Sequence, residues 1–238
     1  MEIASRILFE DNHLILVNKL SGELVQGDFT GDKPLLEKVR DYIKETYNKP
    51  GNVYCGLIHR LDRPTSGIVA FAKTSKALAR MNKLFETREV DKRYYAIVKE
   101  APEPSKAKLI HYLAKDAKKN KSFVYPEGKK GAKRAELDYR LLARSENYHL
   151  LEVKLHTGRH HQIRVQLAHI GSPIKGDLKY HYPRSNHDAS ISLHAGYLSF
   201  VHPVAQEKLE IRAQCLGADA IWRIFNPKIA DEISDWSI

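Results

Sequence analysis

The stretch from Leu57 to Lys73 reads LIHRLDRPTSGIVAFAK, and it decides the fold prediction because it places a polar loop between two buried strands. Residues 57–58 and 68–73 are short apolar runs, as buried strands are. Between them, HRLDRPTSG carries proline and glycine, which mark a turn or loop. A charged loop held by rigid strands is a typical position for a catalytic or binding side chain.

The sequence on either side of this loop predicts many strands and few helices. Strands are expected within 7–19, 93–99, 137–142, 148–155, 191–201 and 209–213, and helices near 34–47, 75–85, 163–170 and 218–225. Connections of hairpin length favour antiparallel pairing. We therefore predict an α+β fold, with a mixed, largely antiparallel sheet and flanking helices, in a single catalytic domain over residues 1–238.

Composition limits the classes to which the chain can belong. Its 238 residues are 42% hydrophobic and carry a net charge of +10. This apolar fraction supports a folded core, and the positive charge favours a polyanionic partner such as nucleic acid. No run of about 18 apolar residues exists and the first twenty residues lack a signal-peptide pattern, so we expect no membrane segment. Cys55 and Cys215 form no CxxC spacing, which favours a reducing cytoplasm.

The positive charge is concentrated between Lys115 and Arg134, where eight basic residues accompany two acidic ones, a net of +6. Two interpretations are open: a solvated surface loop, as charge runs commonly are, or a basic flap that contacts phosphates. Residues 126–128 (PEG) indicate a mobile connection between strands. The side chains expected to reach phosphates are those of Lys118, Lys119, Lys121, Lys129 and Lys130.

Asp62 is the acidic residue of the central loop and stands between Arg60 and Arg63. Nearby positive charge favours the ionised carboxylate. The flanking strands would hold it in place, as a nucleophile or general base requires. The alternative is structural, because an aspartate commonly caps a turn through the backbone N–H groups that follow it, here those of Thr65 or Ser66.

A second polar segment, His156 to Gln166, reads HTGRHHQIRVQ. Arg159 and Arg164 each offer a planar fork to a carboxylate or phosphate. The histidines between 156 and 202 resemble a metal cluster only superficially, because they lack cysteine partners and an HExxH arrangement, so we expect no metal. They are either a polar surface that faces nucleic acid or ordinary core histidines.

A third segment, DKRYYAIV from Asp91 to Val98, places two tyrosines side by side on a strand. Adjacent strand residues point to opposite faces, so one tyrosine is expected to face the core. The other can face a cleft and stack on a base, although both can also serve packing.

These three segments, in this order, closely resemble the RluA-type family of ribosomal and transfer RNA pseudouridine synthases. The match consists of HRLDRPTSG around Asp62, KRYYA at 92–96 and TGRHHQIR ending at Arg164. Further pieces agree, and they are Gly176-Asp177 with Tyr180, LHA at 193–195, and NKLSG at 18–22 in place of the family's N-K-P-S-G. The resemblance runs from about residue 7 to about residue 213.

The resemblance implies a role for each matching residue. Asp62 is similar to the family's catalytic aspartate, Tyr94 to the residue that stacks on the target uracil, and Arg164 to the basic residue paired with that aspartate. Arg60 is similar to the residue that enters the RNA stack when the target base is flipped out. Further RNA contacts are expected from Arg63, Arg159, His161 and Gln162. The family needs no cofactor and no metal.

The sequence departs from the family pattern in two places. Gln166 stands where the family has histidine after HQIR, which puts that histidine's hydrogen bond in doubt. Asp62 also lies too near the N-terminus to leave room for a preceding S4-type RNA-binding domain. We therefore expect a short form of the family, in which one domain selects its RNA.

The resemblance implies an enzyme that isomerises uridine to pseudouridine in structured rRNA or tRNA, as a cytoplasmic monomer. Asp62 would support cleavage of the C1′–N1 bond, either by covalent attack or by taking a sugar proton, and the sequence does not choose between the two. Two other functions compete with this one. A non-catalytic RNA-binding module would have no need for Asp62, Tyr94 and Arg164 together, and a glycosylase would leave an abasic product.

Overall fold

The computed structural model describes residues 1–28, 30–217 and 219–231. Residues 29, 218 and 232–238 lie outside the described part, and the first residue expected in the C-terminal helix is among them. The chain divides into two compact units. The first unit comprises residues 1–92 and 197–213, and the second comprises residues 93–196 and 214–238.

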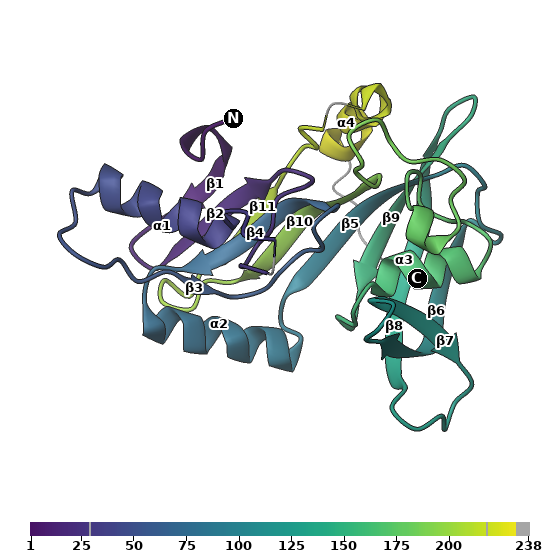
Figure 1. The fold of residues 1–238 in the computed structure, drawn as a ribbon, viewed down its shortest axis with the longest axis horizontal. Coiled ribbons are helices and arrows are strands. Elements are labelled where there is room, and N and C mark those ends of the chain that lie inside the picture. The colour runs from purple at the N-terminus through teal and green to yellow at the C-terminus, as the bar shows by residue number, and fades with distance from the viewer. Residues whose placement is uncertain (29, 218, 232–238) are drawn as a thin grey trace. The chain divides into compact units, whose positions relative to one another are not determined.

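The first unit is an antiparallel sheet with two helices (Figure 1). Its elements are η1 (Ala4–Arg6), β1 (Ile7–Glu10), β2 (Leu14–Lys19), α1 (Leu35–Thr46), β3 (Gly56–Leu57), β4 (Ser66–Ala72), α2 (Ser75–Thr87) and β11 (Lys208–Arg212). β2 pairs with β1 and β4, β3 pairs with β4, and β11 pairs with residues 197–201 of β10 (Leu193–Val201). Helix α2 packs on β3 and β4, and Met81 lies in the core with no exposed surface. The catalytic-loop candidate therefore starts and ends on strands of one well-packed sheet.

In the second unit, five strands pair antiparallel in the order β5-β9-β8-β6-β7. Its strands are β5 (Asp91–Val98), β6 (Lys106–Asp116), β7 (Lys121–Tyr125), β8 (Lys133–Arg144) and β9 (His149–Leu155). Its helices are α3 (Gln162–His169), η2 (Leu178–Tyr180) and α4 (Ala220–Asp231). Helix α3 contacts β6 and β7, and Figure 1 shows it lying across these strands.

The two faces of these five paired strands bury different clusters. One cluster contains Ile163 and Leu167 of α3 together with Leu151 of β9. The other contains Trp222 of α4 together with Leu150, the neighbour of Leu151. Because adjacent strand residues point to opposite faces, α3 and α4 cover opposite sides of this sheet.

The predicted α+β fold with a mixed, largely antiparallel sheet is confirmed, and so are the expected helices and most expected strands. The loop interpretation of the basic stretch is wrong, because residues 115–134 include the end of β6, all of β7 and the start of β8. We call this segment the basic hairpin. Its strand pattern escaped detection because β7 is only five residues long and stands between two lysine-rich stretches. No helix among the described residues is both long and apolar enough to span a membrane.

Candidate active site

Asp62 lies in the loop that joins β3 to β4, as the sequence predicts. Its side chain is partly buried, whereas Arg60 and Arg63 on either side are exposed. The carbonyl oxygen of Asp62 accepts a hydrogen bond from the Thr65 N–H at 3.0 Å, which closes a turn directly after the aspartate. The loop therefore presents a carboxylate at a fixed point of the backbone.

Lys19, at the end of β2, fixes this loop from beneath. Its side chain is fully buried, and its amine donates to carbonyl oxygens of the loop. The distances are 2.6 Å to Thr65, 3.0 Å to Arg63 and 3.4 Å to Asp62, with a further bond of 3.0 Å to Leu20. Buried carbonyl groups need such partners, so a single amine satisfies most of the inner side of the loop.

Two further bonds hold the loop against the segment that follows β2. The Ser21 hydroxyl donates to the Pro64 carbonyl at 2.8 Å, and the Gly22 N–H donates to the Arg63 carbonyl at 2.8 Å. Gly22 has a φ of +84°, a conformation that glycine adopts without strain. The NKLSG segment thus serves as the support of the loop that carries Asp62.

Burial sets the charge state of this support. It lowers the pKa of Lys19 from 10.5 to about 7, while the carboxylates of Glu23 and Asp62 act in the opposite direction. Burial also raises the pKa of Glu23, but hydrogen bonds from Arg6 and Lys38 outweigh it and hold that pKa at about 2. An ionised Glu23 therefore stands near Lys19 across the whole physiological range.

The two arginines of the loop differ in their surroundings. Arg63 donates from Nη2 to Asp32 at 2.6 Å and from Nε to the Gly22 carbonyl at 3.0 Å, so it braces the loop. Arg60 is exposed, as a residue that inserts into an RNA stack must be. His59, next to it, stacks on Phe85 with ring centroids 5.1 Å apart, and burial lowers its pKa to about 3. His59 is therefore a neutral packing residue.

In the second unit, Arg164 of α3 forms a buried pair with Asp177. Its Nε and Nη2 donate to the two carboxylate oxygens of Asp177 at 2.7 and 2.9 Å. Both side chains are nearly inaccessible, and the guanidinium carbon lies 5.2 Å from the centre of the Tyr180 ring. A two-pronged contact of this kind fixes the orientation of the guanidinium plane. Asp177 thus positions Arg164.

Tyr180 links this pair to the basic hairpin. Its hydroxyl accepts a hydrogen bond from the Ser122 N–H of β7 at 2.9 Å. It also lies 2.9 Å from Nδ1 of His161. Burial is the largest cause that lowers the pKa of His161, and the nearby positive charge of Arg164 acts in the same direction. His161 is therefore neutral at physiological pH.

His161 and Gln162, which the resemblance suggests as RNA contacts, lie in the interior of the second unit. Both side chains are buried. The amide oxygen of Gln162 accepts from the Thr157 hydroxyl at 2.8 Å and from the Arg159 N–H at 3.0 Å. Their polar atoms are used inside the protein, so they shape the turn before α3 instead of forming a surface for a ligand.

The two tyrosines of β5 divide as strand alternation predicts. Tyr95 is buried at 3% exposure and packs in the cluster beneath α4 with Trp222. Tyr94 is only partly buried and lies on the opposite face, against the cluster that contains Ile163 of α3. Tyr94 is therefore the tyrosine with ring surface left for a ligand.

Gln166, at the sequence position where the family has histidine, lies in the interior of the protein. It is fully buried, and its amide nitrogen lies 2.9 Å from Nδ1 of His111 on β6. Gln166 therefore joins α3 to the sheet beneath it, and His111 supplies an imidazole next to it.

The remaining predicted contacts lie on the surface of the basic hairpin. Lys118, Lys119, Lys129 and Lys130 are exposed. Lys121 is partly buried, with its amine 5.0 Å from the centre of the Tyr180 ring. Arg159 is partly exposed and donates from Nε to the Arg134 carbonyl at 3.0 Å. Within the described residues, no group of three or more metal-ligating side chains could hold an ion.

Sequence reasoning gave no role to Lys19, to Asp177 or to Tyr180. A signal for Lys19 was present, because it ends the run LILVNK, in which a lysine at a buried position calls for several hydrogen-bond acceptors. No comparable signal marks Asp177 as the partner of Arg164, because the two residues are 13 apart in sequence and meet only through the fold.

Comparison with known proteins agrees with this arrangement. The structure matches that of Human RNA Pseudouridylate Synthase Domain Containing 4 with a TM-score of 0.77 and 23% identity, over 98% of this chain and 96% of the other. The fold is therefore that of the pseudouridine synthases. The family model described as RNA pseudouridylate synthase matches residues 13–169.

Curated relatives extend over most of the chain. Ribosomal large subunit pseudouridine synthase D of Zymomonas mobilis is 31% identical, over 90% of this chain and 70% of its own length. tRNA pseudouridine synthase C of Vibrio cholerae is 32% identical, over 91% of this chain and 92% of its own length. The chain belongs to the RNA pseudouridylate synthase family.

Proposed function

We propose that this enzyme converts uridine to pseudouridine in a structured rRNA or tRNA, with Asp62 as the catalytic carboxylate. The observation that carries the proposal is the support of the Asp62 loop, in which one buried lysine binds three carbonyl groups of the loop backbone. A reacting carboxylate must be held close to its productive position, and a loop pinned in this way meets that requirement.

The chemistry needs no co-reactant, because substrate and product are isomers. Asp62 supports breakage of the C1′–N1 bond, by covalent attack or by removal of a sugar proton. The freed uracil turns, a C1′–C5 bond forms, the C5 proton is lost and N1 gains a proton. A uracil inside RNA structure must first be extruded, at a cost of a few kcal/mol. We assign the filling of the vacated stack to Arg60, which is exposed.

Two side chains of the second unit complete the proposed set. Tyr94 offers a partly exposed ring for stacking on the uracil. Arg164 supplies a fixed positive charge, whose orientation is set by Asp177. We propose that it acts on the Asp62 carboxylate, as the family resemblance implies.

We assign RNA contacts to basic side chains that are exposed or partly exposed. These are Arg60, Arg63, Arg159, Lys118, Lys119, Lys121, Lys129 and Lys130. Both RNA classes are candidate substrates, because one relative above is named for the ribosomal large subunit and the other for tRNA. We further propose a cytoplasmic monomer that acts as one catalytic domain without a cofactor.

The decisive experiment incubates the purified protein with rRNA and tRNA from cells that lack the gene, followed by nucleoside chromatography of the digested RNA. Pseudouridine is expected with the wild type, and less than about 1% of that rate with Asp62→Asn. Asp41→Asn, a nearly isosteric change on α1, is the matched control and should retain full activity. Free uracil would indicate a glycosylase, and unchanged RNA would indicate a binding module. Sequencing-based mapping then identifies the modified position.

A further inference from the structure

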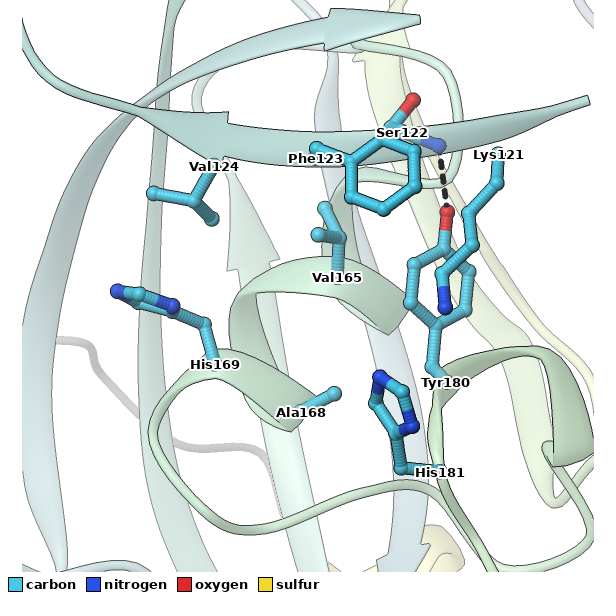
Figure 2. A pocket seen from close by; sticks show the side chains of 9 residues that line it. All are labelled: Lys121, Ser122, Phe123, Val124, Val165, Ala168, His169, Tyr180 and His181. Atoms are coloured by element: carbon cyan, nitrogen blue, oxygen red, sulfur yellow. Dashed lines mark hydrogen bonds between the residues drawn. The ribbon is translucent and has the colours of Figure 1, made fainter. Parts of the chain in front are cut away.

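A small cavity of about 340 Å³ opens in the second unit, beside the basic hairpin. Its apolar lining includes Phe123 of β7 and Val165 and Ala168 of α3 (Figure 2). Ligand pockets for larger molecules span about 300–1,000 Å³, so this volume suits one flat ring system.

The rim of the cavity is basic and aromatic. Lys121, His169 and His181 all contribute to its lining. Figure 2 shows the two imidazoles flanking the space in front of α3, with the Phe123 ring above it. His169 and His181 are both exposed, and the Lys121 amine lies 5.5 Å from the Phe123 ring centre. An apolar interior with a lysine and two imidazoles on its rim is complementary to a ring that carries an anionic group.

The walls of the cavity are fixed before any ligand arrives. The Ser122 N–H donates to the Tyr180 hydroxyl at 2.9 Å, and the Lys179 amine donates to the Asn120 carbonyl at 3.0 Å. The first bond attaches β7 to η2, and the second attaches η2 to the turn that precedes β7. Binding to a preformed site avoids the entropic cost of ordering its walls.

His181 adds an observation about the backbone. Its φ of 73° lies in the left-handed region, where glycine is the residue without strain. Because His181 is exposed, packing does not account for a side chain at this position. This conformation ends η2, as left-handed residues commonly end helices, and it sets the imidazole at the edge of the cavity.

We propose that this cavity binds one unpaired base of the substrate RNA, a nucleotide other than the target uridine. The base stacks against Phe123 over the floor formed by α3, and its phosphate lies at Lys121. The imidazoles of His169 and His181 bond to the base edge. This assignment rests on the proposed function for the identity of the ligand as RNA, and it adds a second recognition point to the enzyme. Stacking on an aromatic ring and a basic rim are the features by which proteins hold single-stranded nucleotides.

Mononucleotides test the cavity directly. AMP, GMP, CMP and UMP are titrated into the full-length protein while NMR follows the imidazole signals of His169 and His181, with ribose 5-phosphate as the control without a base. We expect at least one mononucleotide to shift both signals and to bind about tenfold more tightly than ribose 5-phosphate. Equal binding of ribose 5-phosphate, or no shift with any mononucleotide, would overturn the proposal.

Substitutions then connect the cavity to catalysis. Phe123→Ala removes the stacking surface, and His181→Gly removes the imidazole at a position that glycine accepts without strain. Each is expected to raise the RNA concentration for half-maximal rate about tenfold and to leave the rate at saturation unchanged. His187→Ala, an exposed histidine outside the cavity lining, is the matched control and should change neither value.

The two proposals fail in different ways. Nucleotide binding without any pseudouridine formation would refute the proposed function alone. Pseudouridine formation with unchanged kinetics in both variants would refute the cavity assignment alone.

Discussion

The loop that carries Asp62 and the basic hairpin are both polar, and both contain proline and glycine, yet the protein holds them in opposite ways. The Asp62 loop is bound from beneath by a fully buried lysine and from the side by Ser21 and Gly22. The basic hairpin carries its lysines on exposed positions of strands and turns, where four of the five proposed phosphate contacts face solvent.

This difference teaches how the work of the enzyme is divided. A reacting carboxylate gains from rigid placement, because small displacements of reacting groups are costly to the rate. Phosphate contacts act through charge and tolerate movement, because they are individually weak and additive. Substitutions beneath the Asp62 loop should therefore affect folding and turnover, whereas substitutions on the basic hairpin should affect affinity alone.

The largest effect is expected for Lys19→Met, which removes the donor beneath the loop. The carbonyl groups of Asp62, Arg63 and Thr65 lose a partner, and each unsatisfied buried group costs about 1–3 kcal/mol. We expect a loss of about 5 kcal/mol in the free energy of unfolding, measured in urea. Lys44→Met on the exposed surface of α1 is the control and should change stability by less than about 0.5 kcal/mol. A loss no larger than that of the control would show that Lys19 does not hold the loop.

The difference in stability between the wild type and Lys19→Met should depend on pH. The pKa of Lys19 is lowered from 10.5 to about 7 in the folded state. Between these values the unfolded chain binds a proton that the folded protein has released, so rising pH favours the folded state. The stability of the wild type relative to Lys19→Met should therefore increase by up to about 1.4 kcal/mol per pH unit from pH 7 towards 10, and stay level below pH 7. A difference that does not change with pH would contradict a buried amine with a lowered pKa.

The next largest effect concerns the pair of Arg164 and Asp177. Removing one partner of a buried ion pair leaves an uncompensated charge and commonly costs about 3–5 kcal/mol, so Arg164→Met and Asp177→Asn should each destabilise the protein by about that amount. Arg164→Lys should recover part of the activity, because it keeps the charge but loses the two-pronged contact. The double variant Arg164→Met with Asp177→Asn should cost less than the sum of the two. Additive losses would show that the two side chains are not coupled.

A smaller effect separates the two tyrosines of β5. Tyr94→Ala should weaken RNA binding by about 1–3 kcal/mol with a modest loss of stability, because part of the ring is available for stacking. Tyr95→Ala should instead lower the free energy of unfolding by about 3–5 kcal/mol, since it empties a packed site beside Trp222. Tyr94→Phe keeps the stacking face and should bind RNA normally. Larger catalytic damage from Tyr95→Ala in a folded protein would reverse the assignment.

Short-range patterns allowed much of the fold to be predicted. The apolar runs around the Asp62 loop gave β3 and β4 to within two residues, and alternation along β5 correctly separated the environments of two adjacent tyrosines. These features depend on residues close together in the chain, whose side chains report directly on burial.

Features that depend on distant residues were not predictable in the same way. The partner of Arg164 is set by a loop that folds back 13 residues later, and Lys19 meets residues 43 to 46 positions away. His161 and Gln162 look like surface residues in a polar sequence, yet the turn before α3 directs them inward. The short strand β7 was hidden because its apolar residues, 123–125, stand between two stretches rich in lysine.

The smallest effect is expected for substitutions in the basic hairpin. They test whether this segment, unlike the Asp62 loop, contributes to RNA affinity alone. Replacing Lys118, Lys119, Lys121, Lys129 and Lys130 together with glutamine removes five charges from side chains of which four are exposed and none is fully buried. Each lost phosphate contact should flatten the slope of log affinity against log salt by about 0.7–0.9, so a reduction of about 2–4 is expected, with weaker binding at low salt. The rate at saturating RNA should stay at the wild-type value, because no residue of the proposed catalytic set is altered.

The matched control replaces five exposed lysines of the first unit with glutamine, and they are Lys33, Lys44, Lys49, Lys76 and Lys83. Because both variants lose the same net charge, a purely long-range effect of charge would change their salt slopes equally, whereas contact through the basic hairpin predicts a much larger change in the first. Equal slopes would make the basic hairpin an ordinary solvated surface, and a reduced rate at saturation would show that it also places the RNA for reaction.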